Sequence, residues 1–289
     1  MCEVLTGRHE DFGPAGLGPP QTPAGRPEMV PPRPGTDRRA DAAAATPSEV
    51  GKRSMSTAFV IPVLDEAGRL PELLERLRTL EPPAAGTMPA PLVVVADGGS
   101  VDGGPQLARQ AGATVVLAPR GRGSQIRAGC EAAWAAGSEV AVIVHADTRP
   151  PLDLLVHLEQ ALRQGAVGGG CLVRFDPAPG VLRWAAPLVN WRTRAFEVPL
   201  GDQLQWITRA AWEEIGGMQP WPILEDVDLI RRVRRVGPLA ILPCEAITDA
   251  RRFQRRGPLR TVARNWLIWA LYAAGVSPRR LASLYRDVR

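Results

Sequence analysis

The chain has 289 residues, 45% of them hydrophobic, which is enough to bury a globular core in one or two domains. Its net charge is +5 and Lys52 is its only lysine, so the basic character comes from arginine. No run of about 18 apolar residues predicts a transmembrane helix. The four cysteines show no spacing typical of a disulfide framework or a zinc site, so we expect the protein to be located in the reducing cytoplasm.

Residues 1–54 are rich in proline, glycine and alanine and lack a periodic apolar pattern. Such a segment buries too little surface to offset its chain entropy, so we predict a disordered extension. It lacks the apolar core of a secretory signal. Met55 directly precedes the first predicted strand, so the extension is either a dispensable tail or the product of a mis-assigned start.

Strands and helices alternate along the next part of the chain. Short apolar runs predict strands at 58–63, 92–96, 114–118, 140–144 and 168–175. Stripes at helical spacing predict helices at 67–80, 104–110, 122–136 and 152–163. This order predicts an α/β domain with a mainly parallel sheet and helices on both faces.

After residue 176, prolines and tryptophans interrupt the pattern. We expect either one wall of a pocket there or ordinary core tryptophans. Beyond it we predict a helix at 224–236, a strand at 239–242, an amphipathic helix at 259–274 and a short helix at 278–286. From residue 250 onward ten arginines face one acid, which indicates a partner with phosphates, an anionic membrane or a solvated basic face.

Three acidic sites stand out. Asp97 and Asp147 each follow a predicted strand, and Glu225 and Asp226 open a predicted helix. Open α/β sheets bind ligands at the carboxyl ends of their strands. Carboxylates there can hold a base or ribose, hold a divalent metal, or act as a general base. Acids at helix starts are also common caps, so a purely structural role stays open at each site.

Other polar segments follow the same strands. Asp65 and Glu66 come after the first strand, where they suit either a ligand or a helix cap. The glycines after Asp97 permit close ligand approach, but the absence of G-x-G-x-x-G argues against a dinucleotide or S-adenosylmethionine site. Gly121 and Arg122 open the helix after the third strand, and they suit a diphosphate or form a surface turn.

The segment His145-Ala146-Asp147 emerges from an apolar strand, so its polar side chains point at the ligand edge. One carboxylate together with substrate phosphates is how proteins usually hold Mg²⁺ or Mn²⁺. Capping of the next segment by Asp147 or Thr148 is the alternative.

In this order the motifs resemble those of family-2 glycosyltransferases with the GT-A fold, over residues 57 to about 240. The motifs are Ile61-Pro62-Val63-Leu64-Asp65-Glu66, Asp97-Gly98-Gly99-Ser100-x-Asp102, the metal motif and Glu225-Asp226. Further segments are similar to a bacterial subgroup found beside radical-SAM and selenium-related genes, of the arsenosugar-biosynthesis type. These segments are Gly121-Arg122-x-x-Gln125, His145-Ala146-Asp147-Thr148, Gly201-Asp202-Gln203 and Ala250-Arg251-Arg252-Phe253.

The resemblance implies a nucleotide-diphosphate-sugar donor and the roles of individual residues. Pro62 and Glu66 would line the nucleotide pocket, and Asp97 would contact the base. Asp147 would ligate Mg²⁺ or Mn²⁺, and Asp226, next to Glu225, would be the catalytic base. The other residues assigned to nucleotide-sugar binding are Gly98, Gly121, Arg122, Gln125, His145, Asp202 and Gln203.

Two departures from the family pattern matter. His145 replaces the first acid of the usual D-x-D, which leaves one carboxylate fewer for the metal. The Gln-x-x-Arg-Trp motif typical of processive members is absent, so we expect transfer of a single sugar. The resemblance itself implies that the transfer proceeds with inversion. We expect a transferase domain at 55–245, with the donor half at 55–175 and the acceptor half at 176–245, followed by a basic helical segment at 246–289.

Two other functions fit parts of the sequence. A nucleotidyltransferase on a related fold would need a lysine-bearing triphosphate loop near the first strand, and Leu64-Asp65-Glu66-Ala67-Gly68 has no lysine. A non-catalytic basic protein would bind a membrane or another anion through its arginine-rich end. No nucleic-acid motif is present. For the transferase, we expect the acceptor to be a small molecule or a lipid. A lipid acceptor is compatible with peripheral contact on the inner face of the membrane.

Overall fold

The computed structural model describes residues 55–83, 88–176, 182–249, 264, 267–272 and 274–285. These residues belong to one compact unit, residues 45–289. The predicted disordered extension and half of the predicted helix at 259–274 lie outside the described residues. So does the Ala250-Arg251-Arg252-Phe253 segment.

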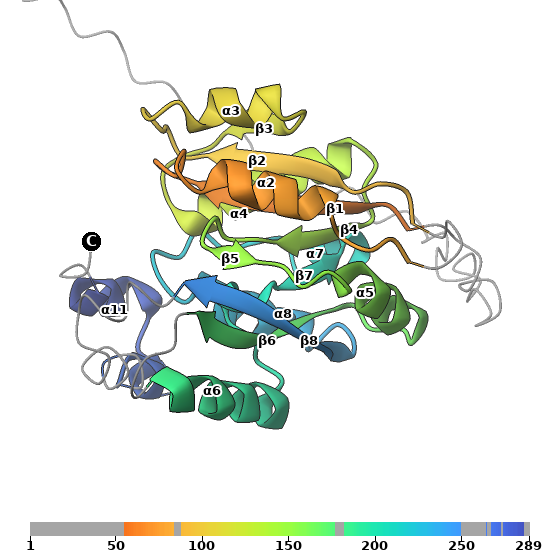
Figure 1. Cartoon of the computed structure of the whole chain (residues 1–289). Coiled ribbons are helices and arrows are strands. Elements are labelled where there is room, and N and C mark those ends of the chain that lie inside the picture. The colour runs from red at the N-terminus through yellow and green to blue at the C-terminus, as the bar shows by residue number, and fades with distance from the viewer. Residues whose placement is uncertain are drawn as a thin grey trace, which may run out of the picture. The chain divides into compact units, whose positions relative to one another are not determined.

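An eight-stranded sheet runs through the unit in the order β3-β2-β1-β4-β7-β6-β8-β5 (Figure 1). The strands are β1 (Thr57–Val63), β2 (Leu92–Asp97), β3 (Thr114–Leu117), β4 (Val140–Ile143), β5 (Thr148–Arg149), β6 (Gly168–Asp176), β7 (Trp206–Thr208) and β8 (Leu239–Asp249). The first four strands are mutually parallel, and β8 is parallel to β6. Only the short strands β5 and β7 pair in antiparallel fashion with their neighbours. The predicted mainly parallel sheet is confirmed.

Helices cover both faces of the sheet. They are α2 (Leu70–Arg78), α3 (Gly104–Gln110), α4 (Arg122–Ala135), α5 (Leu154–Arg163), α6 (Leu182–Phe196), α7 (Arg209–Glu214), α8 (Glu225–Val233) and α11 (Pro278–Tyr285), with the 3₁₀ turn η2 (Gly201–Gln203). Successive strand residues point to opposite faces, and β1 shows the result. Phe59 and Ile61 join the core under α2 and α5, whereas Ala58 and Val60 join the core under α4, α7 and α8.

A glycine brings α4 close to the sheet. A Cβ atom on Gly129 would overlap the side chain of Val60, which is wholly buried in β1. Because the helix axis lies this close to the strand, the first turn of α4 stands beside the carboxyl ends of β1 and β2. This is the edge at which the sequence predicts the site.

The second half of the chain is more regular than its sequence predicts. Residues 182–196 form the helix α6 despite Pro187 within it, and it packs on β6 through Val173 and Phe175. Strand β8 continues to Asp249, well beyond the predicted end at 242. Pro243 has no backbone N–H to donate to the neighbouring strand, and the register between β8 and β6 shifts at Cys171/Leu172. The sequence therefore predicts an earlier end of this strand.

Within the described residues, no helix combines the length and the apolar character needed to cross a bilayer.

We expect Gly129→Ala to lower the free energy of unfolding by about 1–3 kcal/mol, because the new methyl group overpacks a filled core. The higher helix propensity of alanine, about 1 kcal/mol, offsets part of this loss. Gly68→Ala is the matched control, since its Cβ would meet no atom within 4 Å. Urea denaturation measures both. Equal stabilities of the two variants would contradict the close packing of α4 on β1.

Candidate active site

The carboxyl ends of β1, β2 and β4 meet at one edge of the sheet, because these strands are parallel neighbours. Asp97 ends β2 there and is only 6% exposed. Its Oδ1 accepts hydrogen bonds from the backbone N (2.9 Å) and Oγ (2.6 Å) of Ser100. The carboxylate therefore fixes the glycine turn that follows it. Contact of Asp97 with a base stays a prediction.

The loops after β1 and β2 are joined to each other. Asp65 adopts a φ of 55°, its N donates to Ser100 Oγ (3.0 Å), and its Oδ1 accepts from Val101 N (2.9 Å). Asp102 Oδ2 accepts from Ala67 N at 2.6 Å. Backbone hydrogen bonds, first that from Ala67, lower the pKa of Asp102. Two acids of the motifs thus hold the loops together, which the sequence did not predict.

Gln125 supports this edge from within. Its side chain is almost fully buried, and Nε2 donates to the carbonyls of Val63 (2.5 Å) and Ala96 (3.1 Å), one on each strand. A Cβ on Gly98 would lie 3.0 Å from the same Nε2. The described contacts of Gln125 are therefore structural, and its contact with a nucleotide sugar stays a prediction.

Pro62 and Glu66 lie along the same edge. Pro62 is the partner of Ala96 in the β1–β2 register and is half-buried. Glu66 forms an ion pair with Arg69 at 3.0 Å. Both residues stand beside the Asp97 turn. Their contact with a nucleotide stays a prediction.

The first turns of α4 and α8 meet through an ion pair whose carboxylate is buried and whose arginine is half exposed. Arg122 Nη1 lies 3.3 Å from Glu225 Oε1, and Glu225 is 4% exposed. Burial raises the pKa of Glu225, the Arg122 guanidinium opposes that rise, and the charge of Asp226 adds to it. A Cβ on Gly123 would lie 2.9 Å from the carbonyl oxygen of Gln219, so α4 also closely approaches the loop before α8.

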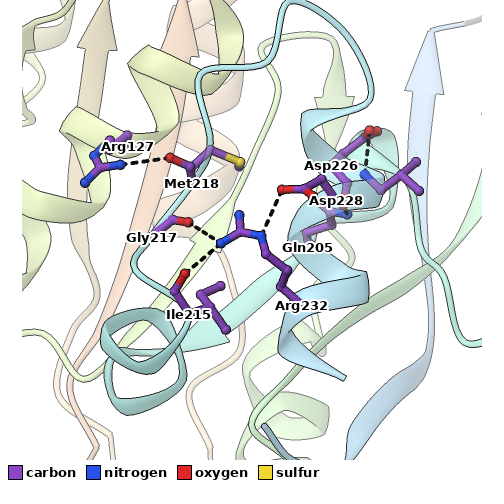
Figure 2. Close-up of polar contacts among 9 residues, drawn as sticks. Arg127, Gln205, Ile215, Gly217, Met218, Asp226, Asp228 and Arg232 are labelled. Carbon is purple, nitrogen blue, oxygen red and sulfur yellow. Dashed lines mark hydrogen bonds and ion pairs between the residues drawn. The ribbon is translucent and has the colours of Figure 1, made fainter. Parts of the chain in front are cut away.

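Asp226 occupies the second position of α8 and is half-buried. Its Oδ1 accepts from Val227 N (2.8 Å), and its Oδ2 accepts from Gly201 N (2.9 Å). Figure 2 shows Gln205 beside it, where Nε2 donates to the Asp226 carbonyl (3.0 Å). Backbone and side-chain groups from three segments therefore fix the position of this carboxylate.

His145 reaches the same place from the end of β4. A Cβ on Gly201 would lie 2.9 Å from His145 Nε2 and 3.4 Å from Asp226 Oδ2. Only glycine leaves room there for both side chains. The structure thus brings together two residues that lie 81 positions apart and that the sequence predicted for one site.

Asp202 completes an acidic cluster with Asp147 and Asp226. Its pKa is raised to about 6, first by burial and then by the negative charge of Asp226, with a smaller contribution from Asp147. Arg192 on α6 opposes this rise. The carboxylates of Asp226 and Asp147 are therefore both close enough to Asp202 to repel its negative charge. Such a cluster suits a cation or a shared proton.

Gln203 is fully buried, and its contact with a nucleotide sugar stays a prediction. Its Oε1 accepts from Leu200 N (2.9 Å), Thr193 Oγ1 (3.1 Å) and Arg192 Nη2 (3.3 Å). Its Nε2 donates to the Cys171 carbonyl (3.0 Å). Gln203 thus fastens η2 to α6 and β6. No sequence motif pointed to Arg192 or Thr193, because α6 was not predicted.

The loop between α7 and α8 is held by arginine (Figure 2). Arg232 Nη1 donates to the carbonyls of Ile215 and Gly217, each at 2.8 Å, and its Nε donates to Asp228 (2.9 Å). Arg127 on α4 donates to the Met218 carbonyl (3.1 Å). These contacts set the position of α8, and hence of Asp226, relative to α4. Charged residues at helical spacing do not reveal such a role in a sequence.

A cavity of about 300 Å³ opens at the same edge of the sheet. It is lined by Gly68, Arg69, Glu72, Leu73, Ala146, Asp147, Thr148, Arg149, Asp176 and Asp249. Asp249 N donates to the Asp147 carbonyl (3.2 Å), which ties the end of β8 to the metal motif. Arg69 Nη2 lies 3.9 Å from Asp249 Oδ2. No sequence motif pointed to Arg69 or Asp249 as residues of this cavity.

The donor set bears on metal binding. Nowhere in the described ranges are three His, Cys, Asp or Glu side chains grouped so as to hold a metal ion. Mg²⁺ and Mn²⁺ usually take one or two protein carboxylates and complete their coordination with substrate phosphates and water. Asp147, whose charge also acts on Asp202, fits that mode of binding.

An α/β unit with its acidic cluster at the carboxyl edge of a mainly parallel sheet has the architecture of GT-A glycosyltransferases. A family model described as glycosyl transferase family 2 matches residues 58–210, just over half of the chain. The chain belongs to glycosyl transferase family 2, and the predicted family is confirmed. No curated protein sequence matched the chain.

Solved structures share the fold at low sequence identity. Glucosyl-3-phosphoglycerate synthase from Mycobacterium tuberculosis, with Mn²⁺, UDP and glucosyl-3-phosphoglycerate, has a TM-score of 0.53 at 17% identity, covering 81% of this chain and 86% of that one. S. aureus TarS 1-349 has a TM-score of 0.53 at 14% identity, covering 68% and 61%. Its complex with UDP-GlcNAc has a TM-score of 0.51 at 13% identity, covering 68% and 58%. The chain thus spans less than two thirds of the TarS structures, and these likenesses show the fold.

The raised pKa of Asp202 makes stability depend on pH. The folded chain holds this proton up to about pH 6, whereas the ordinary pKa is 3.8, so ionised Asp202 destabilises the fold above pH 6 and has no such effect below pH 4. We expect Asp202→Asn to raise the free energy of unfolding near pH 7 by about 1–2 kcal/mol, after allowance for partial exposure. The gain should vanish as the pH falls from about 6 to about 4.

Urea denaturation across this pH range, with EDTA present, measures the effect. Asp176→Asn is the control, because that carboxylate is half exposed and paired with Arg149. A gain that is the same at both ends of the pH range would contradict the buried charge of Asp202.

Proposed function

We propose that the protein transfers a sugar from a nucleotide-diphosphate sugar to an acceptor hydroxyl, with inversion at the anomeric carbon. The observation that carries the proposal is the convergence of His145, Asp147, Asp202 and Asp226 at the carboxyl edge of the sheet. Family membership supports the reaction class. The structures that share the fold include complexes with UDP and with UDP-GlcNAc, which supports a nucleotide-sugar donor.

Asp226 is the proposed general base. Two backbone N–H groups orient its carboxylate in the first turn of α8. Asp226 takes the proton of the acceptor hydroxyl while the acceptor oxygen attacks the anomeric carbon. The bond from that carbon to the donor phosphate breaks, and its electron pair leaves with the nucleoside diphosphate. Attack from the face opposite the leaving group inverts the configuration.

Glu225 has a different proposed part. Its carboxylate is buried against Arg122, so it is directed toward α4 and the predicted diphosphate site. An acid held in that pair positions the arginine and the start of α8. Of the two adjacent acids, Asp226 is therefore the better candidate for direct proton transfer.

The donor is proposed to lie along the edge formed by β1, β2 and α4. Pro62, Glu66, Asp97 and Gly98 would line the nucleoside portion. Gly121 and Arg122, at the first turn of α4, would face the diphosphate, because a helix start presents N–H groups to anions. His145 and Asp202 would approach the sugar from the opposite side, while Gln125 and Gln203 hold the walls.

Asp147 is the proposed ligand of Mg²⁺ or Mn²⁺. When bound, the metal would stabilise the negative charge that develops on the leaving diphosphate. The Mn²⁺ in the M. tuberculosis synthase structure supports divalent-metal use on this fold.

The finer assignments belong to the same proposal. The described segments Gly121-Arg122-x-x-Gln125, His145-Ala146-Asp147-Thr148 and Gly201-Asp202-Gln203 support membership of the radical-SAM-associated subgroup. We propose transfer of a single sugar to a small-molecule or lipid acceptor, by a domain spanning residues 55–245 with the extensions 1–54 and 246–289 appended. A cytoplasmic location, with the basic end in peripheral membrane contact, is proposed from the sequence.

We expect Asp226→Asn to lower the transfer rate roughly 10²–10⁴-fold, as loss of a general base does, while donor affinity stays unchanged. Asparagine keeps an oxygen for the Gly201 N–H, so the local structure should persist. Asp228→Asn, two positions away and paired with Arg232, is the control and should retain activity. Nucleoside-diphosphate release from the donor measures the rate. Wild-type turnover in Asp226→Asn would rule out this base.

We expect Asp147→Ala to remove the metal-dependent part of nucleotide binding. A nucleotide sugar with Mn²⁺ should raise the melting temperature of the wild type by mass action, and EDTA should reduce that shift. In Asp147→Ala the shifts with Mn²⁺ and with EDTA should be equal. Asp176→Asn, at the rim of the same cavity, serves as control. A wild-type shift insensitive to EDTA would contradict the metal assignment.

A further inference from the structure

An exposed apolar strip runs along α6 and takes no part in the proposed reaction. Leu188 is 50% exposed, Trp191 60% and Phe196 52%. Leu188 and Trp191 are three positions apart, so they neighbour each other on the helix surface. The Trp191 and Phe196 rings stand edge to face, with centroids 6.3 Å apart. These side chains therefore form a continuous patch rather than scattered exposed residues.

The strip adjoins an open groove of about 700 Å³ between α6 and the sheet. The groove is lined by Val173, Arg174, Ala186, Pro187, Asn190, Trp191, Arg194, Ala195 and Glu245. In Figure 1, α6 lies beside β6, on the side of the sheet away from β3. The face is thus well separated in the strand order from β1 and β2, where the donor is proposed to bind.

The edge of β6 is closed to strand addition at this groove. Asn190 Oδ1 accepts from Val173 N (2.8 Å), and Asn190 Nδ2 donates to the Val173 carbonyl (2.9 Å). The side-chain amide replaces a neighbouring strand, a common way of protecting an edge. A partner at this face must therefore bind through side chains, which argues against an added peptide strand.

The charge of the face favours an anionic partner. Helix α6 contains no acid, and Arg194 is exposed on the strip. The two nearest glutamates are already in ion pairs: Glu245 lies 3.6 Å from Arg174, and Glu197 lies 2.9 Å from Arg234. A second copy of the chain would present the same basic patch to it in a symmetric contact, so like charges would meet.

We propose that this face of α6 (Leu188, Trp191, Arg194 and Phe196) docks on an anionic lipid bilayer. Leucine and aromatic side chains enter the boundary between headgroups and acyl chains, while arginine reaches the phosphates. Arg192 and Thr193, which are buried on the same helix, hold Gln203 beneath the active-site loop. Docking would place the acceptor half of the site next to the membrane.

The test is co-sedimentation of the full chain with vesicles of phosphatidylcholine alone or mixed with phosphatidylglycerol. We expect binding to the anionic vesicles that weakens as salt rises. Leu188→Ser/Trp191→Ser should weaken binding at least tenfold, and Arg194→Gln about fivefold. The control Leu117→Ser/Val156→Ser removes exposed apolar side chains elsewhere, and it should bind as the wild type does.

Circular dichroism confirms that each variant is folded. Absence of binding to anionic vesicles, or equal loss in the control, would overturn the proposal. Analytical ultracentrifugation without lipid tests the other occupant: a dimer that Leu188→Ser/Trp191→Ser dissociates would make this face a contact between copies. Because vesicle binding is measured without substrate, its failure leaves the proposed transfer reaction untouched, and the converse also holds.

Discussion

The hydrogen bond from Gly201 N to Asp226 Oδ2, 2.9 Å long, holds together the segments that converge on the site. It joins the η2 turn to the first turn of α8, and His145 from β4 lies against the same glycine. Gln203 then fastens this turn to α6 and β6. If the turn moved, the carboxylate of Asp226, the imidazole of His145 and the acid Asp202 would separate together. Most of the surrounding polar contacts serve to prevent that movement.

The site concentrates unfavourable interactions that the rest of the fold must offset. The negative charges of Asp226 and Asp147 disfavour ionised Asp202, and a fourth carboxylate, Glu225, is buried against Arg122. Leu204 and Leu224 adopt positive φ values of 48° and 60° on either side of this cluster, a conformation that costs about 1–3 kcal/mol for residues other than glycine. Such strain and repulsion persist only in a well-packed scaffold, and they are typical of sites that bind cations or move protons. The two-sided core of the sheet supplies that scaffold.

The first half of the fold could be predicted from the sequence because its signals are local. Strands such as Val140–Ile143 are buried on both faces and read as short apolar runs, and each polar motif directly follows one. The second half could not, because its elements depend on tertiary contacts. Helix α6 contains a proline, and β5 and β7 are two and three residues long. Gln125 and Gln203 illustrate the same limit within the site: the sequence pattern located them, but only the packing shows that both amides hold backbone groups.

The most direct test of the account is a comparison of products from two reaction mixtures with the wild-type chain and Mn²⁺. One contains a panel of nucleotide-diphosphate sugars with candidate acceptors, and the other contains nucleoside triphosphates with sugar 1-phosphates. Mass spectrometry identifies the products of each. The proposed glycosyl transfer predicts a nucleoside diphosphate and a glycosylated acceptor from the first mixture and no reaction in the second. Pyrophosphate and a new nucleotide sugar from the second mixture, with no transfer in the first, would contradict it.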